Sequence, residues 1–455
     1  MRTISRRDWL MTMSSGFGYF ALAGLSGSAA CAEGNNPLAP RTPHFAPQAK
    51  RVIFACMRGG PSHVDTFDYK PKLAKSDGKD APGFKGRKLL ESPFKFSQRG
   101  QSGQWISSLF PRLSGHADQL CVINSMHTDV PNHPQAFLMM HTGEFRFTRP
   151  SMGSWVLYGL GSENEDLPGF VTISPTSNLG GAQNYSSAFL PAIYQGTAIG
   201  REGQKASQAG IGNIEARHLP AALQRQQLDL VQSMNRNLLA RQEVNADVEG
   251  VIESYELAFR MQGALPDVLD IKDETQATLD MYGIQGESDQ FGRQCLMARR
   301  LAESGVRFIE ITHGNWDQHK NLKSALSGNA QAIDRPLAAL LTDLEKRGLL
   351  KDTLVIWGGE FGRTPHVKAK DGRDHNATAY SMWLAGGGVR GGLRYGASDD
   401  FGVKAVQDKV HPHDLHATML KLLGLDHERL AYRYGGRDYK LTGVGEAKVV
   451  QGIIA

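Results

Sequence analysis

Two short β-like apolar segments, 307–312 and 353–357, each lead into a loop that is rich in metal-ligand residue types. The first loop places Asp317 and His319 two positions apart, and the second loop carries Glu360. A carboxylate oxygen and an imidazole nitrogen together suit Zn²⁺ or another first-row divalent ion. The two loops therefore predict a metal-assisted hydrolytic site. The simpler alternative for the first loop is an exposed turn with an incidental histidine.

Three further side chains are candidates for the same site. His313 precedes Asp317 by four positions, and His375 follows the second loop. Arg363 could neutralise an anionic ester, because a guanidinium binds phosphate or sulfate through two parallel hydrogen bonds. The structural alternative is a salt bridge between Glu360 and Arg363 that only holds the loop.

The elements that must position these loops have the order of a βαβ unit. A helix is predicted over about 329–347, between the two apolar segments. Open α/β sheets bind ligands at the carboxyl ends of their strands, which is where both loops would lie. No Gly-x-Gly-x-x-Gly motif follows an early strand, so the pattern does not favour a dinucleotide-binding fold.

Two loops in the first half of the chain are comparable. The apolar run 52–57 is the predicted first and central strand of a parallel sheet, and the loop after it carries Ser62 and Asp65. The loop after the second predicted strand carries Thr128 and His133. A Gly-Pro turn and a plain surface loop are the alternatives, but four such loops at successive strand ends favour a shared site.

The composition is that of an ordinary globular protein. The chain has 455 residues, of which 40% are hydrophobic and 21% charged, with a formal net charge of +5. Its Lys and Arg residues are scattered, so no nucleic-acid partner is expected. After the leader, the cysteines are three and irregularly spaced, which argues against a disulfide framework and a Cys-based zinc site. Cys56 and Cys121 lie in apolar runs and are predicted to be packing residues.

The first 32 residues have the features of a twin-arginine signal peptide. Arg6 and Arg7 precede a weakly apolar stretch and a small-residue site, Ala30-Cys31-Ala32. The apolar stretch is about 16 residues long, whereas a membrane span needs about 20, so an uncleaved anchor is the less favoured alternative. We therefore expect export by the twin-arginine translocase and a periplasmic or secreted protein.

The rest of the chain divides into a linker and one domain. Four prolines within 33–48 indicate a linker, and 49–455 is predicted to be a single α/β domain. The pattern between about 214 and 290 is helical and carries no ligand cluster, so it is predicted to be a helical insertion.

Seven sequence motifs are shared with a known family. They are GGPSHVDTFDYKP (59–71), VPNHPQAF (130–137), FGRQCLMARRLAESGVRF (291–308), NWDQH (315–319), GGEFGRTP (358–365), GRDH (372–375) and DLHATMLKLLGL (414–425). Together they resemble the DUF1501 family, which is placed in the alkaline phosphatase-like superfamily with sulfatases and cofactor-independent phosphoglycerate mutases. The resemblance covers nearly everything after the linker and implies an alkaline phosphatase-like α/β fold, with a mostly parallel central sheet flanked by helices.

The resemblance also implies a ligand set. In that superfamily two divalent metals stabilise the attacking and leaving oxygens of an in-line displacement. The motif positions imply that Asp317, His319 and His375 hold one metal. Glu360 stands where the superfamily has the Asp of an Asp-His pair, and Phe361 replaces its His, so the resemblance implies a second metal site that lacks one ligand.

The remaining roles are assigned less directly. Asp65 is implied as the ligand after the first strand. The motif position of the nucleophile falls at Asp129, which leaves its neighbour Thr128, Ser62 and a water activated by the metal as rival attackers. Arg363 with His133 would orient the anion. No Cys-x-Pro-x-Arg or Ser-x-Pro-x-Arg motif occurs, so formylglycine chemistry is not supported.

The expected function is that of an exported metal-dependent hydrolase of phosphate or sulfate esters, with a small-molecule or polysaccharide substrate. One or two ions are expected, with Zn²⁺ favoured over Mn²⁺, Ca²⁺ or Mg²⁺. The competing interpretation is a non-catalytic, sulfatase-like envelope protein that binds an anionic polysaccharide or a partner protein. A phosphomutase is less favoured, because the phosphorylated metabolites of such enzymes are mainly intracellular.

Overall fold

The computed structural model describes residues 36–205, 220–239, 246–286, 289–367 and 371–455. The predicted signal peptide, 1–32, lies outside the described residues, as do parts of the predicted linker and insertion. The described linker residues contact the domain: Leu38 is buried, and Arg41 donates a hydrogen bond of 2.7 Å to the backbone oxygen of Tyr158.

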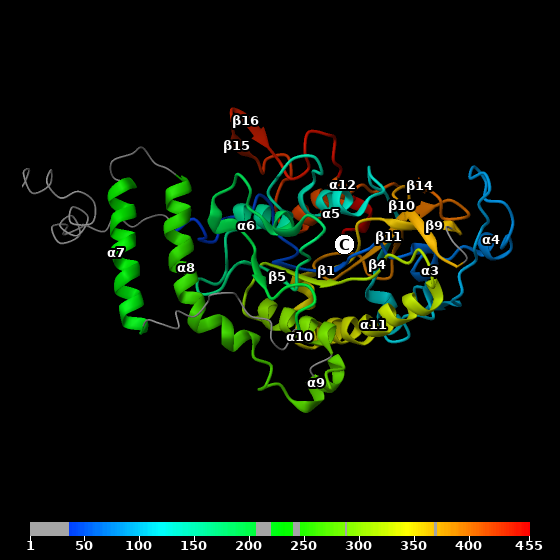
Figure 1. Ribbon diagram of the computed structural model, residues 1–455, viewed down its shortest axis with the longest axis horizontal. Coiled ribbons are helices and arrows are strands. Elements are labelled where there is room, and N and C mark those ends of the chain that lie inside the picture. Colours follow the sequence, from blue (N-terminus) through cyan, green and yellow to red (C-terminus); the bar gives the residue numbers. More distant parts are fainter. Residues whose placement is uncertain (1–35, 206–219, 240–245, 287–288, 368–370) are drawn as a thin grey trace, which may run out of the picture.

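The centre of the protein is an eight-stranded sheet (Figure 1). β7 and β8 flank β1 in parallel, and within this sheet only β11 runs antiparallel to its neighbours. The prediction of an α/β fold with a mostly parallel central sheet is confirmed. In order across the sheet, the strands are β12 (Arg394–Tyr395), β4 (Cys121–Met126), β11 (Tyr380–Ala385), β8 (Thr353–Gly358), β1 (Arg51–Met57), β7 (Phe308–His313), β5 (Phe170–Ile173) and β6 (Thr197–Ile199).

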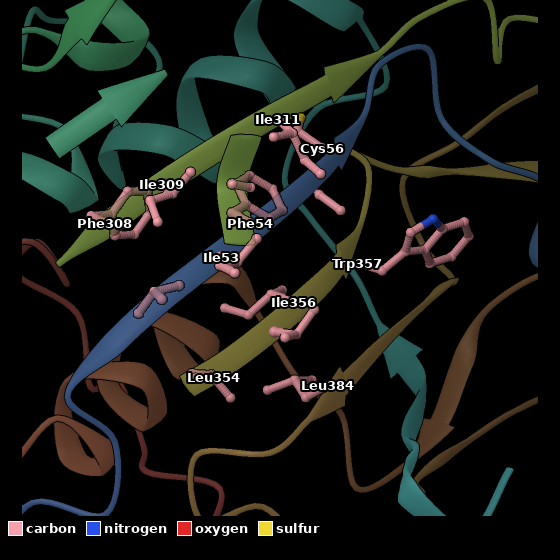
Figure 2. Close-up of a cluster of buried hydrophobic side chains, with 14 of the residues drawn as sticks. Ile53, Phe54, Cys56, Phe308, Ile309, Ile311, Leu354, Ile356, Trp357 and Leu384 are labelled. Carbon is pink, nitrogen blue, oxygen red and sulfur yellow. The ribbon is translucent and has the colours of Figure 1, made fainter. Parts of the chain in front are cut away.

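Helices cover both faces of the sheet. Figure 1 shows α5 (His133–Thr142), α6 (Met152–Leu160) and α12 (Pro412–Leu422) on one face, with α10 (Gln290–Glu303) and α11 (Leu322–Lys346) on the other. Because both faces are covered, every residue of β1 is buried, as its continuous apolar sequence predicts. Figure 2 shows this core, where Ile53 and Phe54 of β1 lie among the apolar side chains of the neighbouring strands.

The start of α5 is fixed by local chemistry. The side chain of Asn132 accepts a hydrogen bond from the backbone nitrogen of Gln135, and Pro134 stands in the first turn, where no intrahelical donor is needed. The helix ends at Gly143, whose φ of 69° lies in the left-handed region. These signals set the position of His133 at the first turn of the helix.

The described residues between β6 and α10 contain three helices. They are α7 (Ala221–Leu239), α8 (Ala246–Leu269) and α9 (Gln276–Tyr282). Figure 1 shows α7 and α8 side by side at one end of the molecule. Met261 and Leu265 of α8 are buried, whereas Leu223 and Leu230 of α7 are exposed, so the apolar contacts of this region concentrate on α8. Among the described residues, no helix has the length and apolar character that a membrane span requires.

Short elements complete the fold. The region 68–103 contains a helix and the first strand of a small hairpin, and the long helix α11 begins seven residues before the predicted start at 329. The short elements are α3 (His63–Thr66), α4 (Pro71–Ala74), β2 (Phe96–Arg99), β3 (Gln104–Ser107), β9 (Gly362–Val367), β10 (Arg373–Asn376), β13 (Ala397–Ser398), β14 (Ala405–Gln407), β15 (Tyr432–Tyr434) and β16 (Arg437–Tyr439).

Candidate metal centre

The loops that follow β1, β7 and β8 meet at one edge of the sheet, because these three strands are parallel neighbours. Gly59 has a φ of 113°, and a Cβ at this position would lie 2.8 Å from the backbone nitrogens of Trp316 and Asp317. Glycine therefore allows the loop after β7 to lie directly against the end of β1. Gly372 allows a second close approach, since its Cβ would lie 1.9 Å from the backbone oxygen of His319.

Asp317, His319 and His375 present three ligand atoms to one point. Oδ1 of Asp317 lies 2.9 Å from Nε2 of His319 and 3.3 Å from Nε2 of His375, and the two imidazole nitrogens are 3.1 Å apart. Ligand atoms about 2.0–2.2 Å from one tetrahedral ion are separated by about 3.3–3.6 Å. The structure thus brings these three predicted ligands together with spacings close to those around a single ion.

The ring of His375 has the orientation of a ligand. β9 and β10 form an antiparallel pair that places His375 opposite Arg363. Nδ1 of His375 lies 2.7 Å from the backbone oxygen of Pro131, which can only accept, so Nδ1 carries a proton. In the neutral ring, Nε2 then presents a lone pair to Asp317, and a cation or a second proton must lie between them. This donor set fits a divalent ion, and backbone carbonyls commonly orient metal-binding histidines in this way.

His133 links the ligand set to Glu360. Nδ1 of His133 lies 2.6 Å from Oε1 of Glu360, and Nε2 lies 3.4 Å from Oδ2 of Asp317, at ion-pair distance but without an aligned hydrogen bond. Glu360 is buried and also accepts a hydrogen bond of 3.0 Å from the backbone nitrogen of Gly59. Burial acts to lower the pKa of His133, but Asp317 and Glu360 outweigh it and raise the pKa to about 8.

Arg363 is held at the edge of the ligand set by backbone oxygens. Its Nε donates to the oxygen of Gly60 at 3.0 Å, Nη2 donates to the oxygen of Gly59, and Nη2 lies 2.5 Å from Oδ1 of Asp317. Nη1 is buried and has no hydrogen-bond partner among the described residues. Burial lowers the pKa of Arg363 although Asp317 opposes this shift. The salt bridge between Glu360 and Arg363, which was the structural alternative for this loop, is absent from the ion pairs of the described residues, because Asp317 pairs with the guanidinium.

Phe361 forms an apolar wall of the centre. Its ring is buried and lies 4.7 Å from the ring of His133 and 4.8 Å from that of His375, between centroids. Phe361 therefore packs against two imidazoles. It donates nothing to an ion.

Asp65 and Ser62 do not join this centre, which corrects the assignment of Asp65 as a ligand and Ser62 as an attacker. Both oxygens of Asp65 bind Arg373, at 2.6 Å from Nε and 3.0 Å from Nη2, and all three side chains are buried. The hydroxyl of Ser62 donates to Asp65 at 2.5 Å. The physical reason is that the buried bidentate guanidinium of Arg373 already neutralises the charge of this carboxylate and holds both of its oxygens.

The structure also describes the surroundings of two other sequence candidates, His313 and Thr128. Nδ1 of His313 accepts a hydrogen bond from the indole of Trp316 at 3.1 Å, and burial lowers the pKa of His313 to about 4. The hydroxyl of Thr128 is buried and has no hydrogen-bond partner within the described ranges. The backbone nitrogen of Thr128 donates to the oxygen of Ala377, so the residue lies beside the chain that carries His375.

Sequence reasoning missed Arg373, which neutralises Asp65, and a buried pair formed by His141 and Glu310. Arg373 had no recognisable signal, because its partner is 308 positions away. Glu310 had one: it is a charged residue in the middle of an apolar strand, and such a residue needs a buried partner.

Carboxylate and imidazole ligands at the carboxyl edge of a parallel sheet, beside a buried guanidinium, define a candidate metal centre for anionic substrates. The chain belongs to the family described as "Protein of unknown function (DUF1501)", whose profile matches residues 49–454. No curated protein matches the chain.

Solved structures similar to this chain include sulfatases and phosphatases. Ps i-CgsB is 12% identical, with a TM-score of 0.40 over 83% of this chain and 73% of that one. The PsFucS1 sulfatase from Pseudoalteromonas sp. is 12% identical, with a TM-score of 0.36 over 84% and 68%. The alkaline phosphatase from the Antarctic bacterium TAB5 is 11% identical, with a TM-score of 0.33 over 84% and 99%.

Proposed function

We propose that this protein is an exported, metal-dependent hydrolase of phosphate or sulfate esters. One observation carries the proposal: Oδ1 of Asp317 and Nε2 of His319 and His375 converge within 3.3 Å of one another. A buried guanidinium, that of Arg363, contacts the same carboxylate oxygen. A cation site and an anion site in contact are what catalysis on a negatively charged ester needs.

Asp317, His319 and His375 would hold the ion. When bound, it would supply Lewis-acid stabilisation of the charge that develops on the ester oxygens. The protein contributes the rigid placement of these ligands: His375 is fixed by the backbone oxygen of Pro131. The close packing of Gly59 and Gly372 fixes the loop that carries the other two ligands.

Arg363 would bind the phosphate or sulfate group. Two backbone carbonyls hold its Nε and Nη2, which leaves Nη1 as the donor without a partner in the described part of the chain. Because the guanidinium is already desolvated and oriented, it needs little reorganisation to contact an anionic oxygen. Sulfate and phosphate groups present the same tetrahedral arrangement of oxygens to the guanidinium. The proposed substrates therefore include both ester classes.

His133 would handle a proton. Glu360 accepts from Nδ1 and so fixes the ring, while Nε2 faces Asp317 and lacks an aligned hydrogen bond. From there His133 could hold a proton at Nε2 and pass it to the leaving oxygen of the ester. The attacking group would be Thr128 or a water molecule, since the hydroxyl of Ser62 is committed to Asp65.

Metal content and hydrolysis test the proposal together. The protein, purified without chelator, should contain stoichiometric divalent metal and should hydrolyse members of a panel of phosphate and sulfate monoesters and diesters. Asp317→Ala should lose the ion of this centre and the hydrolysis while the circular dichroism spectrum stays unchanged. Wild-type metal content and turnover in this variant would refute the assignment.

The same measurements decide the competing function. A non-catalytic protein that binds an anionic polysaccharide would carry no stoichiometric metal at this centre and would show no turnover on any ester of the panel. The intact ligand set favours the hydrolase, whereas Phe361 in the place of a ligand favours the binding protein.

Export is a separate part of the proposal and rests on Arg6 and Arg7. Replacing both with lysine should retain the protein in the cytoplasmic fraction. An unchanged distribution between cytoplasm and periplasm would contradict this part and leave the hydrolase proposal intact.

A further inference from the structure

A second group of ligand-type side chains lies in the core of the protein. Sγ of Cys56, Nε2 of His141 and a carboxylate oxygen of Glu310 all lie within 4.8 Å of one another. Each of the three residues is at most 3% exposed. The function proposed above uses none of them, and a charged carboxylate in an apolar core calls for a compensating charge.

Regular elements hold these three residues, as expected of a built site. Cys56 lies near the end of β1 and Glu310 in the middle of β7, and the two strands pair in parallel. His141 comes from the last turn of α5. Its ring lies 5.7 Å from that of Phe54, which precedes Cys56 by two positions and so shares its face of β1. Cys56 belongs to the packed core drawn in Figure 2.

The ring of His141 is oriented like that of a metal ligand. Its Nδ1 lies 2.8 Å from the backbone oxygen of Phe137, which can only accept, so Nδ1 carries a proton. Nε2 then faces Oε1 of Glu310 at 3.1 Å. Two acceptors at this distance need a second proton or a metal ion between them. A backbone carbonyl behind the ring is a common support for a histidine that binds metal.

We propose that Cys56, His141 and Glu310 form a buried structural site for a divalent transition-metal ion, with Zn²⁺ as the best-matched ion. Thiolate, imidazole and carboxylate are the ligand classes of zinc. Binding releases the thiol proton and any proton between His141 and Glu310. The thiolate and the carboxylate then carry two negative charges, which the ion neutralises within the core.

The hydroxyl of Thr172 is independent evidence that a polar partner is missing beside Glu310. Thr172 lies beside Glu310 in the register of β5 and β7, on the same face of the sheet. Its hydroxyl is fully buried and has no hydrogen-bond partner among the described residues. A buried hydroxyl without a partner is costly, and an ion at Glu310 would give it one.

The site would anchor the helix that serves the candidate metal centre. α5 carries His133 in its first turn and His141 in its last, and both rings face groups that extend from the sheet. An ion bound to β1, β7 and α5 would fix the helix against the sheet and so fix His133 beside Glu360. The interpretation of Cys56 as a packing residue would then be incomplete.

Cobalt substitution tests the proposal without any reference to activity. Protein produced with Co²⁺ as the only added transition metal should show the near-ultraviolet charge-transfer band of a thiolate bound to cobalt. Cys56→Ser should abolish this band and lower the bound cobalt by one equivalent. The matched controls Cys121→Ser and Cys295→Ser change buried cysteines outside the cluster and should keep the band.

Two further variants separate this site from the candidate metal centre. Asp317→Asn should lose the ion of that centre and keep the thiolate band, so each proposal can fail alone. If Cys56→Ser does not fold, Glu310→Gln serves instead and should lose the buried cobalt to a chelator, whereas wild-type protein retains it. Wild-type protein without the band, and with no more cobalt than Cys56→Ser, would overturn the proposal in favour of a protonated His141–Glu310 pair.

Discussion

Two arginine–carboxylate pairs join the small β9–β10 sheet to segments that follow strands of the central sheet, and they differ in which polar groups they leave available for a ligand. Arg373 binds both oxygens of Asp65, and neither side chain is exposed. Arg363 contacts one oxygen of Asp317, whose side chain is 43% exposed. We call Arg373–Asp65 the closed pair, because each charge already has its partner, and Arg363–Asp317 the open pair. The second keeps a carboxylate oxygen, neighbouring imidazoles and a guanidinium nitrogen available for a ligand.

The comparison shows that residue type and loop position do not by themselves identify a metal ligand. Asp65 and Asp317 both follow central strands, and both were expected at the site. What separates them is the kind of partner and the burial: a buried guanidinium holds both oxygens of Asp65, whereas the partly exposed Asp317 contacts one guanidinium nitrogen and several imidazoles. A buried bidentate ion pair fixes structure, because removing one partner leaves a charge without compensation. A partly exposed carboxylate beside imidazoles is suited to bind an ion.

The largest expected effect falls on the open pair. Asp317→Asn should lower hydrolysis by about 1,000-fold or more, equivalent to about 4 kcal/mol of transition-state stabilisation, because it removes a negatively charged ligand. Ester turnover and metal content measure the effect. Asp270→Asn, a surface change in the helical insertion, is the matched control and should leave both unchanged.

The closed pair should respond in the opposite way. Arg373→Met leaves the carboxylate of Asp65 buried and unpaired, so we expect the free energy of unfolding to fall by about 3–5 kcal/mol. Urea denaturation measures this loss. Metal content of the folded fraction should stay at the wild-type level, since the pair holds no ion. Asp65→Asn combined with Arg373→Gln should recover part of the stability, and a stable Arg373→Met protein would break the distinction between the pairs.

Much of the fold was predictable, because it rests on local patterns. The continuous apolar run of β1 predicted a buried central strand, and the alternation of apolar segments with helical ones predicted a mostly parallel α/β sheet. The loop prediction for 313–319 was useful because Asp317 and His319 lie two positions apart and share one loop. His375 could be added because its motif resembles that of a known family.

The rest of the site was not predictable, because it depends on contacts between distant segments. Only the β9–β10 pairing places His375 opposite Arg363. Arg373 and Asp65 are 308 positions apart, and no local sequence pattern predicts their ion pair. The contact of His133 with Glu360 likewise depends on where α5 packs. Charge compensation is a property of the folded core, so a sequence can propose ligands but cannot show which are already neutralised.

A smaller effect on substrate binding should show whether Arg363 acts through the shape of its guanidinium or only through its charge. Arg363→Lys keeps the charge but loses the fork that donates to Gly59, Gly60 and Asp317 together. We expect KM for an anionic ester to rise by about 10–100-fold, equivalent to about 1–3 kcal/mol, with metal content retained. Arg433→Lys, in the exposed β15–β16 hairpin, is the control. Unchanged KM would show that the guanidinium serves structure, as that of Arg373 does.

The smallest effect concerns stability at low pH. Lowering the pH should reduce stability through a buried imidazole before it disrupts the two pairs. Burial acts to raise the pKa of Asp317, but His133, His375 and Arg363 outweigh it and hold that pKa well below its ordinary value. His416 behaves differently: burial first, and then His413, lower its pKa to about 3, while its Nε2 donates to the backbone oxygen of Met140 at 2.7 Å. Above about pH 6.5 this imidazole is neutral in both states and adds no pH dependence.

Below that value the unfolded chain binds a proton at His416 and the folded protein does not, so stability falls as the pH drops from about 6.5 towards 3. The contribution of His416 should reach about 2 kcal/mol at pH 5, measured as the difference in unfolding free energy between pH 7 and pH 5. His416→Gln keeps a donor for Met140 and cannot titrate, so its curve should be flatter by this amount. Equal slopes for the two proteins would mean that acid acts elsewhere, and the arginine–carboxylate pairs would then be the first groups to test.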